Sequence, residues 1–415
     1  MSVMKRREFL HLGALAAGGT LITSRLCFAR AASPRRAPFV LVILRGALDG
    51  LAAVPPCGDR DYAHLRGEFA LHAPGEPKGA LPLDGFFGLH PSLAFLGQSY
   101  AARELVVFHA AASPYRERSH FDGQDVLENG SARPHALQSG WLNRALAQVP
   151  GERRREAGVA LGQNVPLVMR GPAEVASWSP SKLAGLDDDT LARITDLYSK
   201  DPVLSVRLAD ALMADSIVAE SGDAMAQPAM AAAAGAPAQN PKAPAQYAEI
   251  VRAAAGFLRQ EDGPQVAVFD TTGWDTHANE GGAEGQLAGR LAALDKGLAT
   301  LKADLGPTWT DTAVLLVTEF GRTAAINGTR GTDHGTGTMS FLVGGAVAGG
   351  RVVADWPGLS GRALYQGRDL MPTLDLRCVM KGVLEEHLGV PERTLDTAVF
   401  PDSARARALR GLIRT

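Results

Sequence analysis

The chain has 415 residues, of which 46% are apolar, and its formal net charge at pH 7 is −2. This length is enough for one large hydrophobic core, with or without a subdomain. Positive and negative charges are nearly balanced in the whole chain, and the net charge becomes more negative when the export signal described below is removed. The composition therefore argues against a protein that binds nucleic acid.

The first 31 residues have the pattern of a twin-arginine export signal. Arg6 and Arg7 precede a short apolar run, and residues 29–31 offer a cleavage site with small residues. The run is shorter than a membrane span and is interrupted by Arg25, so we expect no stable membrane anchor after cleavage. The sequence therefore predicts export by the twin-arginine translocase, with a mature chain of residues 32–415 in the periplasm or secreted.

Removal of the signal takes away five basic residues and one acidic residue, which moves the net charge from −2 to −6. Only Cys57 and Cys378 then remain. They can pair in an oxidising compartment, but two cysteines do not make a disulfide scaffold or a thiolate metal cluster. The twin-arginine route carries folded proteins, so it is compatible with a cofactor that is bound before export.

Apolar runs without alternating polar residues predict strands that are buried on both faces, as in a parallel sheet covered by helices. Amphipathic patterns with three- and four-residue spacing predict helices between them. The predicted strands are 39–44, 105–110, 265–270 and 313–319, with a fifth candidate at 341–345, and the predicted helices are 92–103, 139–149, 284–305 and 370–389. This alternation predicts an α/β fold with a mostly parallel central sheet flanked by helices.

The middle of the chain has a different pattern, and we interpret residues 151–256 as a helical excursion from the sheet, such as a cap, within a single domain. Residues 186–220 are predicted to form two helices with no strand between them. Residues 224–246 are rich in alanine, proline and glycine, which is typical of a flexible surface segment.

In a parallel sheet, ligand-binding side chains gather beyond the carboxyl ends of the strands. After the first predicted strand, Asp49 lies in a glycine-rich turn, where an aspartate commonly bonds to its own turn. After the second, Ser119 can cap a helix that begins at His120, and the same geometry offers a hydroxyl and free N–H groups to an anion. A helix cap alone explains these residues equally well.

Two further strand ends carry acidic and histidine side chains. Asp275 and His277 are two positions apart in "GWDTHANE", so an extended backbone directs both to one face, where they can bind a divalent cation, form a proton-transfer pair or close a turn. The last predicted strand end and the loop after it contribute Glu319, Arg322, Asp333 and His334. Convergence of acids and histidines on one edge of one sheet favours a metal-assisted hydrolase.

Motifs spread over nearly the whole mature chain resemble the domain of unknown function 1501 family of exported bacterial proteins. They are the twin-arginine start, "LVILRGALDGL", "LHPSLAFL", "RSHFDGQDVLENG", "GWDTHANE", "TEFGRT" and "GTDHGTGTMSFLVGGAVAGG". This family is similar to a distant branch of the alkaline phosphatase and sulfatase superfamily. The resemblance implies an alkaline phosphatase-like α/β sandwich that hydrolyses phosphate or sulfate esters with one or two divalent metal ions.

The resemblance also implies roles for single residues. A nucleophile at a helix start is matched by Ser119, and an Asp-His metal pair after a later strand is matched by Asp275 and His277. A last histidine ligand is matched by His334, with Asp333 beside it.

Two positions depart from the superfamily pattern. Arg45 stands where an acidic ligand follows the first strand, with Asp49 as the nearest acid. Phe320 stands where a histidine would follow Glu319. A one-metal site, altered chemistry and lost catalysis all remain open on these departures.

The leading hypothesis is an exported hydrolase that acts on a small anionic ester, a phosphate or a sulfate, with a divalent ion of Zn, Mn, Fe, Mg or Ca. Its candidate catalytic residues are Ser119, His120 and Arg322, and its candidate metal ligands are Asp49, Asp275, His277, Glu319, Asp333 and His334. The alternatives are a non-catalytic exported binding or assembly protein on the same fold, and a metal-free serine esterase that uses Ser119 with a histidine. No G-x-S-x-G elbow surrounds Ser119, which argues against the esterase.

Overall fold

The computed structural model describes residues 37–149, 157–180, separate positions between 193 and 217, and residues 243–414. The predicted export signal, residues 1–31, lies outside the described residues. Within the described part, no helix combines the length and the apolar character that a membrane crossing needs.

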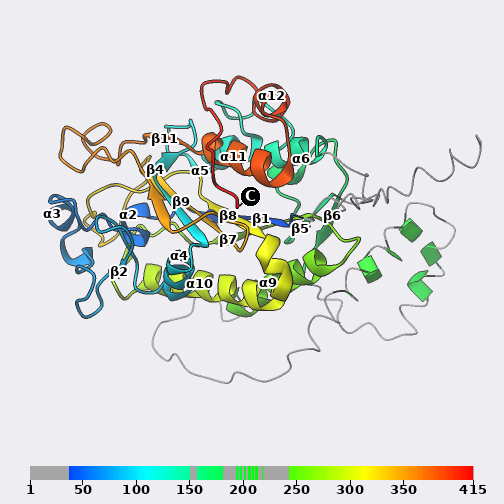
Figure 1. Ribbon diagram of the computed structural model, residues 1–415, viewed down its shortest axis with the longest axis horizontal. Helices are drawn as coiled ribbons and strands as arrows, with labels where there is room; N and C mark the ends of the chain where they lie inside the picture. Colours follow the sequence, from blue (N-terminus) through cyan, green and yellow to red (C-terminus); the bar gives the residue numbers. More distant parts are fainter. Residues whose placement is uncertain are drawn as a thin grey trace, which may run out of the picture. The chain divides into compact units, whose positions relative to one another are not determined.

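A nine-stranded sheet forms the centre of the fold, with the strand order β10-β4-β9-β8-β1-β7-β5-β6 and with β11 paired to β4 (Figure 1). Every pair in this sheet is parallel except the two that β9 makes with β4 and β8. The strands are β1 (Phe39–Arg45), β4 (Leu105–Ala112), β5 (Gly158–Leu161), β6 (Val175–Trp178), β7 (Val266–Thr272), β8 (Ala313–Val317), β9 (Thr338–Val343), β10 (Arg351–Val353) and β11 (Leu374–Asp375). The predicted α/β fold with a mostly parallel sheet is confirmed.

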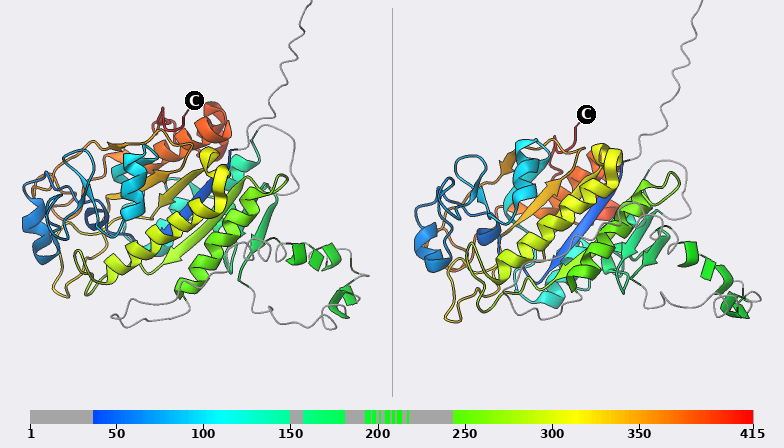
Figure 2. Two further views of the ribbon diagram at one scale, coloured as in Figure 1. Left: turned by 60° about the horizontal axis from the view of Figure 1, so that its bottom comes forward. Right: turned by 90° about the horizontal axis from the view of Figure 1, so that it is seen from below.

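Helices cover both faces of this sheet, and the packing of β1 shows why residues 39–44 are all apolar. Val40, Val42 and Leu44 belong to one buried cluster and Phe39, Leu41 and Ile43 to another, because alternate side chains of a strand point to opposite faces. The first cluster includes α4 (Ala94–Ala101), α9 (Ala243–Arg259) and α10 (Gln286–Leu305), which lie below the sheet in Figure 1 and in front of it in the right-hand view of Figure 2. The second includes α5 (His120–Asn129), α6 (Trp141–Leu146) and α11 (Leu376–Leu388).

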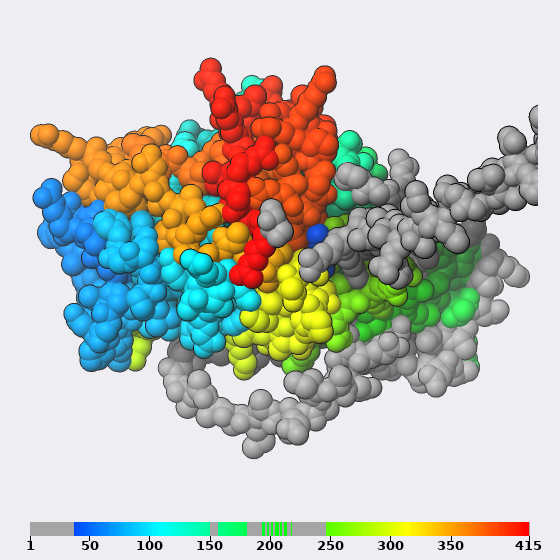
Figure 3. Space-filling view, viewed as in Figure 1, coloured from blue at the N-terminus to red at the C-terminus, as the bar shows by residue number. Residues whose placement is uncertain are grey.

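Shorter elements complete the described part of the chain. They are a hairpin of β2 (Leu81–Pro82) and β3 (Gly88–Leu89), the helices α2 (Gly50–Ala53), α3 (Tyr62–Arg66) and α12 (Glu392–Thr394), the 3₁₀ helices η1 (Gly67–Phe69), η2 (Leu167–Met169) and η3 (Gly306–Asp311), and the π-helix η4 (Leu395–Val399). The C-terminal residues, red in Figure 3, return to the segment after β9, where Ala348 N donates to Leu412 O at 2.8 Å.

All five predicted strands and the helices predicted at 92–103, 139–149 and 284–305 are present. The helix predicted at 370–389 begins later, at Leu376, because residues 374–375 pair with β4 and Asp375 caps the helix by accepting from Arg377 N. Cys57 and Cys378 are both free thiols in the structure.

The interpretation of residues 151–256 as an excursion from the sheet needs correction at both ends. β5 pairs with β7, and β6 extends the sheet beyond β5. These four-residue strands escaped notice because so short a run shows no periodicity. At the other end, α9 packs against α10 and β7, and its first turn includes residues 243–246 of the predicted flexible segment. Residues 224–242 lie outside the described part, and the positions described between 193 and 217 are helical except Asp201.

Candidate metal centre

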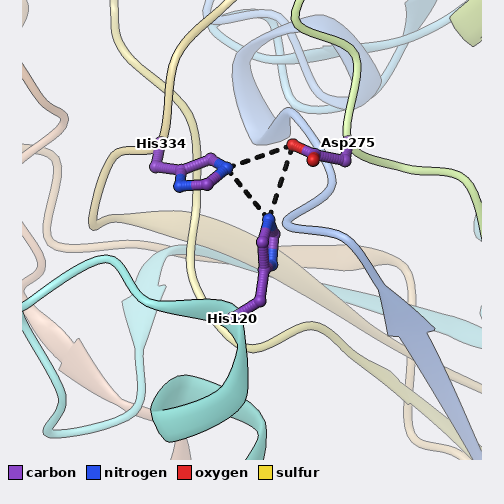
Figure 4. A group of neighbouring side chains, drawn as sticks. All are labelled: His120, Asp275 and His334. Carbon is purple, nitrogen blue, oxygen red and sulfur yellow. Dashed lines mark hydrogen bonds and ion pairs between the residues drawn. The ribbon is translucent and has the colours of Figure 1, made fainter.

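Four side chains converge beyond the carboxyl ends of β7 and β8. Nε2 of His334 lies 2.9 Å from Nε2 of His120, 2.9 Å from Nε2 of His277 and 3.2 Å from Oδ1 of Asp275. The same Asp275 oxygen lies 3.0 Å from Nε2 of His277 and 3.5 Å from Nε2 of His120. Figure 4 shows His120, Asp275 and His334 pointing at one another from three different segments.

The sheet brings these segments together. His120 opens α5, directly after the N-cap Ser119, while Asp275 and His277 follow β7 and His334 lies in the loop between β8 and β9. The backbone after β1 passes closely under Asp275: a Cβ atom on Gly46, whose φ is +119°, would lie 2.7 Å from Asp275 N. Only glycine allows this approach without strain.

Each histidine has an oxygen atom beside its other ring nitrogen. Nδ1 of His120 lies 2.8 Å from Oε1 of Glu319, and Nδ1 of His334 lies 3.0 Å from the carbonyl oxygen of Arg118. Nδ1 of His277 lies 3.5 Å from Oδ1 of Asp333. A carbonyl oxygen only accepts, so Nδ1 of His334 carries the proton and its Nε2 presents a lone pair to the centre. This is the arrangement that metal-bound histidines show in proteins.

The residues fit a divalent cation. Lone pairs on two Nε2 atoms at 2.9 Å repel each other unless a positive charge lies between them, and Nε2 of His334 faces two such atoms and a carboxylate. In a tetrahedral site with bonds of about 2.0 Å, ligand atoms lie roughly 3.3 Å apart, and the five separations given above run from 2.9 to 3.5 Å. Among the described residues, only His120, Asp275 and His334 have ligand atoms that all lie within 4.8 Å of one another, so His277 joins the set through His334 and Asp275. Three imidazole nitrogens and one carboxylate oxygen suit Zn²⁺ or another first-row transition ion better than Mg²⁺ or Ca²⁺, which prefer oxygen.

The electrostatics favour ionised acids around the centre. Burial opposes ionisation of Asp275, but the charge of Arg322 and the three histidines outweigh it, so the pKa of Asp275 is lowered. Burial likewise opposes ionisation of Glu319, and hydrogen bonds from His120 and Gln124 lower its pKa. The hydrogen bond to Glu319 raises the pKa of His120, because the carboxylate stabilises the protonated imidazole.

Arg322 adds a buried positive charge to the centre. Its side chain is fully buried, and its Nη2 lies 2.8 Å from Oδ1 of Asp275 as an ion pair. None of its guanidinium nitrogens has a hydrogen-bond partner with suitable geometry among the described residues. Buried donors without acceptors are costly, so this guanidinium is suited to receive the oxygens of an anion.

Of the predicted metal ligands, Asp275, His277 and His334 meet at the centre, and Glu319 and Asp333 lie one step behind it. Oε1 of Glu319 already accepts from His120, from Gln124 at 3.1 Å and from Gly46 N at 2.9 Å. Both acids thus hold the far nitrogen of a histidine and do not themselves point to the centre. The prediction that they are direct ligands is wrong for this arrangement, because their oxygens face Nδ1 atoms.

Asp49 has a different place altogether. Its Oδ1 accepts from the backbone N–H groups of Leu51 and Ala52 at the start of α2, and its Oδ2 lies 2.5 Å from Nη2 of Arg66. Arg66 also contacts Glu280 at 3.3 Å, and all three ionisable side chains are buried. Asp49 therefore caps a helix and forms a buried ion pair, and its prediction as a metal ligand is corrected.

The two departures from the superfamily pattern have structural counterparts. The ring of Phe320 is buried and stacks on His120, with centroids 5.0 Å apart and planes inclined by 29°. Arg45 forms ion pairs with Asp270 and, at 2.7 Å, with Glu128. An aromatic wall and a paired cation thus occupy the positions where the resemblance implies metal ligands.

Two groups at the centre were missed or given another role by the sequence analysis. His120 was expected as a catalytic residue beside Ser119, and its Nε2 instead points at the other ligands. Arg118 acts through its backbone carbonyl. Because every residue has such a carbonyl, the amino-acid sequence does not indicate this role. Ser119 is half-buried at the N-cap of α5, and its backbone N–H donates to the hydroxyl of Tyr115 at 3.2 Å.

A cavity of about 230 Å³ adjoins the loop that carries His334. Asp333 and Asn327 line it, and Nδ2 of Asn327 donates to Oδ1 of Asp333 at 2.9 Å and to the carbonyl of His277 at 3.0 Å. The remaining lining residues are Leu65, Thr323, Ala325, Ile326, Leu364, Gly367 and Arg368. Apolar and polar groups therefore meet next to the centre.

Comparison with known proteins gives a family and some distant structures. A family model described as "Protein of unknown function (DUF1501)" matches residues 99–398. The comparison with curated proteins found no match.

Similar solved structures include Ps i-CgsB in complex with k-i-k-neocarrahexaose, at 10% identity over 90% of this chain and 77% of that chain, with a TM-score of 0.36. The zinc complex of the C-terminal periplasmic domain of EcEptC from Escherichia coli has 8% identity over 75% of this chain and 74% of that chain, with a TM-score of 0.30. The phosphonate monoester hydrolase of Agrobacterium radiobacter has 12% identity over 85% of this chain and 74% of that chain, with a TM-score of 0.35. Likenesses at this level carry no argument about activity.

Proposed function

The chain belongs to the DUF1501 family, and we propose that it is an exported, metal-dependent hydrolase of phosphate or sulfate esters. One observation carries the proposal: the lone-pair nitrogens of His120 and His334 and a carboxylate oxygen of Asp275 all lie within 4.8 Å of one another. His277 completes the set through its contacts of 2.9 Å with His334 and 3.0 Å with Asp275.

His120, Asp275, His277 and His334 would hold the ion. When bound, a divalent ion supplies a Lewis acid that offsets negative charge developing on the ester oxygens. Arg322 would bind the nonbridging oxygens of the ester, because its buried guanidinium has donors to spare. The cavity beside Asp333 offers space for part of the alcohol group.

Ser119 is the proposed nucleophile. It stands at the N-cap of α5, next to His120, where the N–H groups of the helix start favour negative charge. Its hydroxyl oxygen would form a bond to phosphorus or sulfur while the bond to the alcohol oxygen breaks, and water would then release the product and restore the serine.

The test combines metal analysis with turnover. Protein purified without chelators should contain stoichiometric metal and hydrolyse a nitrophenyl phosphate or nitrophenyl sulfate. Asp275→Ala should lose both properties, whereas Glu261→Ala, an exposed acid between α9 and β7, should keep both. Wild-type protein without metal, together with an unaffected Asp275→Ala variant, would refute the proposal.

A non-catalytic exported binding protein is the second candidate, because Phe320 and Arg45 occupy positions that the resemblance assigns to ligands. Stoichiometric metal with no turnover in a broad phosphatase and sulfatase screen would favour it. Export itself is also a proposal. Replacement of Arg6 and Arg7 by lysine should leave the precursor in the cytoplasm, and a variant that still reaches the periplasm would argue against the twin-arginine route.

A further inference from the structure

A line of hydrogen bonds leads from Arg45 to the candidate metal centre. Nη1 of Arg45 donates to Oε1 of Gln124 at 3.0 Å. Nε2 of Gln124 donates to Oε1 of Glu319 at 3.1 Å, and the same oxygen lies 2.8 Å from Nδ1 of His120. We propose that Arg45 and Gln124 are positioning residues that act through Glu319 to fix the tautomer and the ring orientation of His120.

The direction of this line follows from what each group can do. A guanidinium is always protonated and only donates, so Gln124 must turn its oxygen towards Arg45. Its NH₂ group then faces Glu319, whose oxygen accepts. An acceptor at that point keeps the proton of His120 on Nδ1 and leaves the lone pair of Nε2 for the centre. The reverse orientation of the amide would place two oxygens together at Glu319.

Arg45 is well anchored for this role. Its Nη1 lies 2.7 Å from Oε1 of Glu128 in α5, and its Nε pairs with Asp270 in β7. Oε2 of Glu128 in turn accepts from Val168 N at 3.0 Å. The cation is therefore tied to the helix that carries His120 and to the strand that leads to Asp275. This explains why a basic residue stands at the end of β1.

The inference rests on the proposed metal centre and is tested by metal affinity. Zn²⁺ affinity of the metal-free chain is measured by competition with a chromophoric chelator, for wild type, Gln124→Met, Arg45→Lys and the double variant. Loss of a group behind a metal-bound histidine commonly costs about 10–100-fold in affinity, so we expect Gln124→Met to weaken binding by about tenfold. Arg45→Lys should weaken it by a smaller factor, because lysine keeps the charge but not the fixed guanidinium geometry.

The double variant gives the sharpest readout. If Arg45 acts through Gln124, the double variant should bind Zn²⁺ as weakly as Gln124→Met alone, whereas independent effects would multiply. Multiplying effects, or Gln124→Met with wild-type affinity, would overturn the inference while leaving the proposed function intact. Wild-type protein that binds no Zn²⁺ would instead refute the metal centre itself.

Controls separate this role from general stability. Gln98→Met replaces an exposed glutamine on α4. Lys302→Met removes an ion pair of 2.7 Å with Glu104, which lies just before the first residue of β4, whereas His120 follows the carboxyl end of that strand. Both should keep wild-type affinity. Gln124 is only half-buried, so its methionine variant should keep the wild-type thermal midpoint. If the control variants also lost Zn²⁺ affinity, the effect would not be specific to the hydrogen bonds of Gln124, and the inference would be contradicted.

Discussion

The carbonyl oxygen of Arg118 lies 3.0 Å from Nδ1 of His334, and Arg118 presents it from a left-handed backbone with a φ of +62°. Non-glycine residues rarely adopt this conformation, and it persists where surrounding contacts enforce it. Here the side chain of Arg118 bonds through Nε to the buried Asp369 at 2.8 Å and through Nη2 to Gln366 at 2.7 Å. The ion pair thus helps to place the acceptor of a candidate metal ligand.

Asp369→Asn should therefore weaken Zn²⁺ binding, by several-fold to about tenfold, because Arg118 loses its charged partner and its carbonyl is held less firmly. The measurement is the same chelator competition. Glu68→Gln is the matched control: Arg330 has a similar φ of +59° and an ion pair of 2.9 Å with Glu68, but both side chains are exposed. Equal losses in the two variants would contradict a specific role for Asp369.

Removal of Asp49 should affect stability and leave the metal centre alone. Asp49→Ala leaves the buried Arg66 with one acidic partner instead of two, and breaking a buried ion pair typically costs about 3–5 kcal/mol of unfolding free energy. Urea unfolding measures that loss, and Zn²⁺ affinity of the folded variant should equal that of wild type. A large loss of affinity without a loss of stability would instead return Asp49 to the list of ligands.

The stability of the protein should fall as the pH rises from about 5 to about 8, relative to a Glu280→Gln variant. Burial, followed by the nearby charge of Asp49, raises the pKa of Glu280 to about 8, against 4.5 for an ordinary glutamate. The folded state then binds a proton that the unfolded state has lost, so stability is fully present below about 4.5 and declines towards 8.

Glu280 is faced by Arg66, Asp49, Thr276 and Thr332. None of these four side chains changes its charge between pH 5 and pH 8, so they do not cause the expected fall in stability. Urea midpoints of the two proteins, measured at pH 5 and pH 8, test this. Parallel pH dependences would show that Glu280 is ionised in the folded state.

Metal removal separates the proposed hydrolase from a serine esterase. Dialysis against a chelator should abolish ester hydrolysis, and added Zn²⁺ or Mn²⁺ should restore it. Ser119→Ala should lose turnover but keep metal affinity, since Ser119 is not one of the four side chains that converge at the centre. Turnover of nitrophenyl acetate that survives the chelator and disappears in Ser119→Ala would favour the esterase.

More of the fold than of the candidate metal centre could be predicted from the sequence. β1, β4, β7 and β8 each contain at least four consecutive buried apolar residues, and burial on both faces leaves that signature directly in the sequence. β5 and β6 have four residues each, and only the pairing of β5 with β7 and of β6 with β5 makes them part of the sheet.

At the site, Asp275 and His277 could be predicted because both lie two positions apart on one extended segment. The division between ligands and the acids behind them could not be predicted. Glu319 and His120 are 199 positions apart, and only the folded packing decides that the carboxylate meets Nδ1. The stacking of Phe320 on His120 belongs to the same class of contact, because no periodicity records it.

The four candidate ligands come from segments that are joined only when the sheet is complete, since β4 reaches β1 through β9 and β8. An ion at this point would act as a cross-link between α5, the segment after β7 and the loop before β9. It would bind the native chain and not the unfolded one, and would therefore raise the melting temperature in proportion to the logarithm of its free concentration. Metal binding would therefore report that the chain has folded, because the ligands come together only in the native sheet.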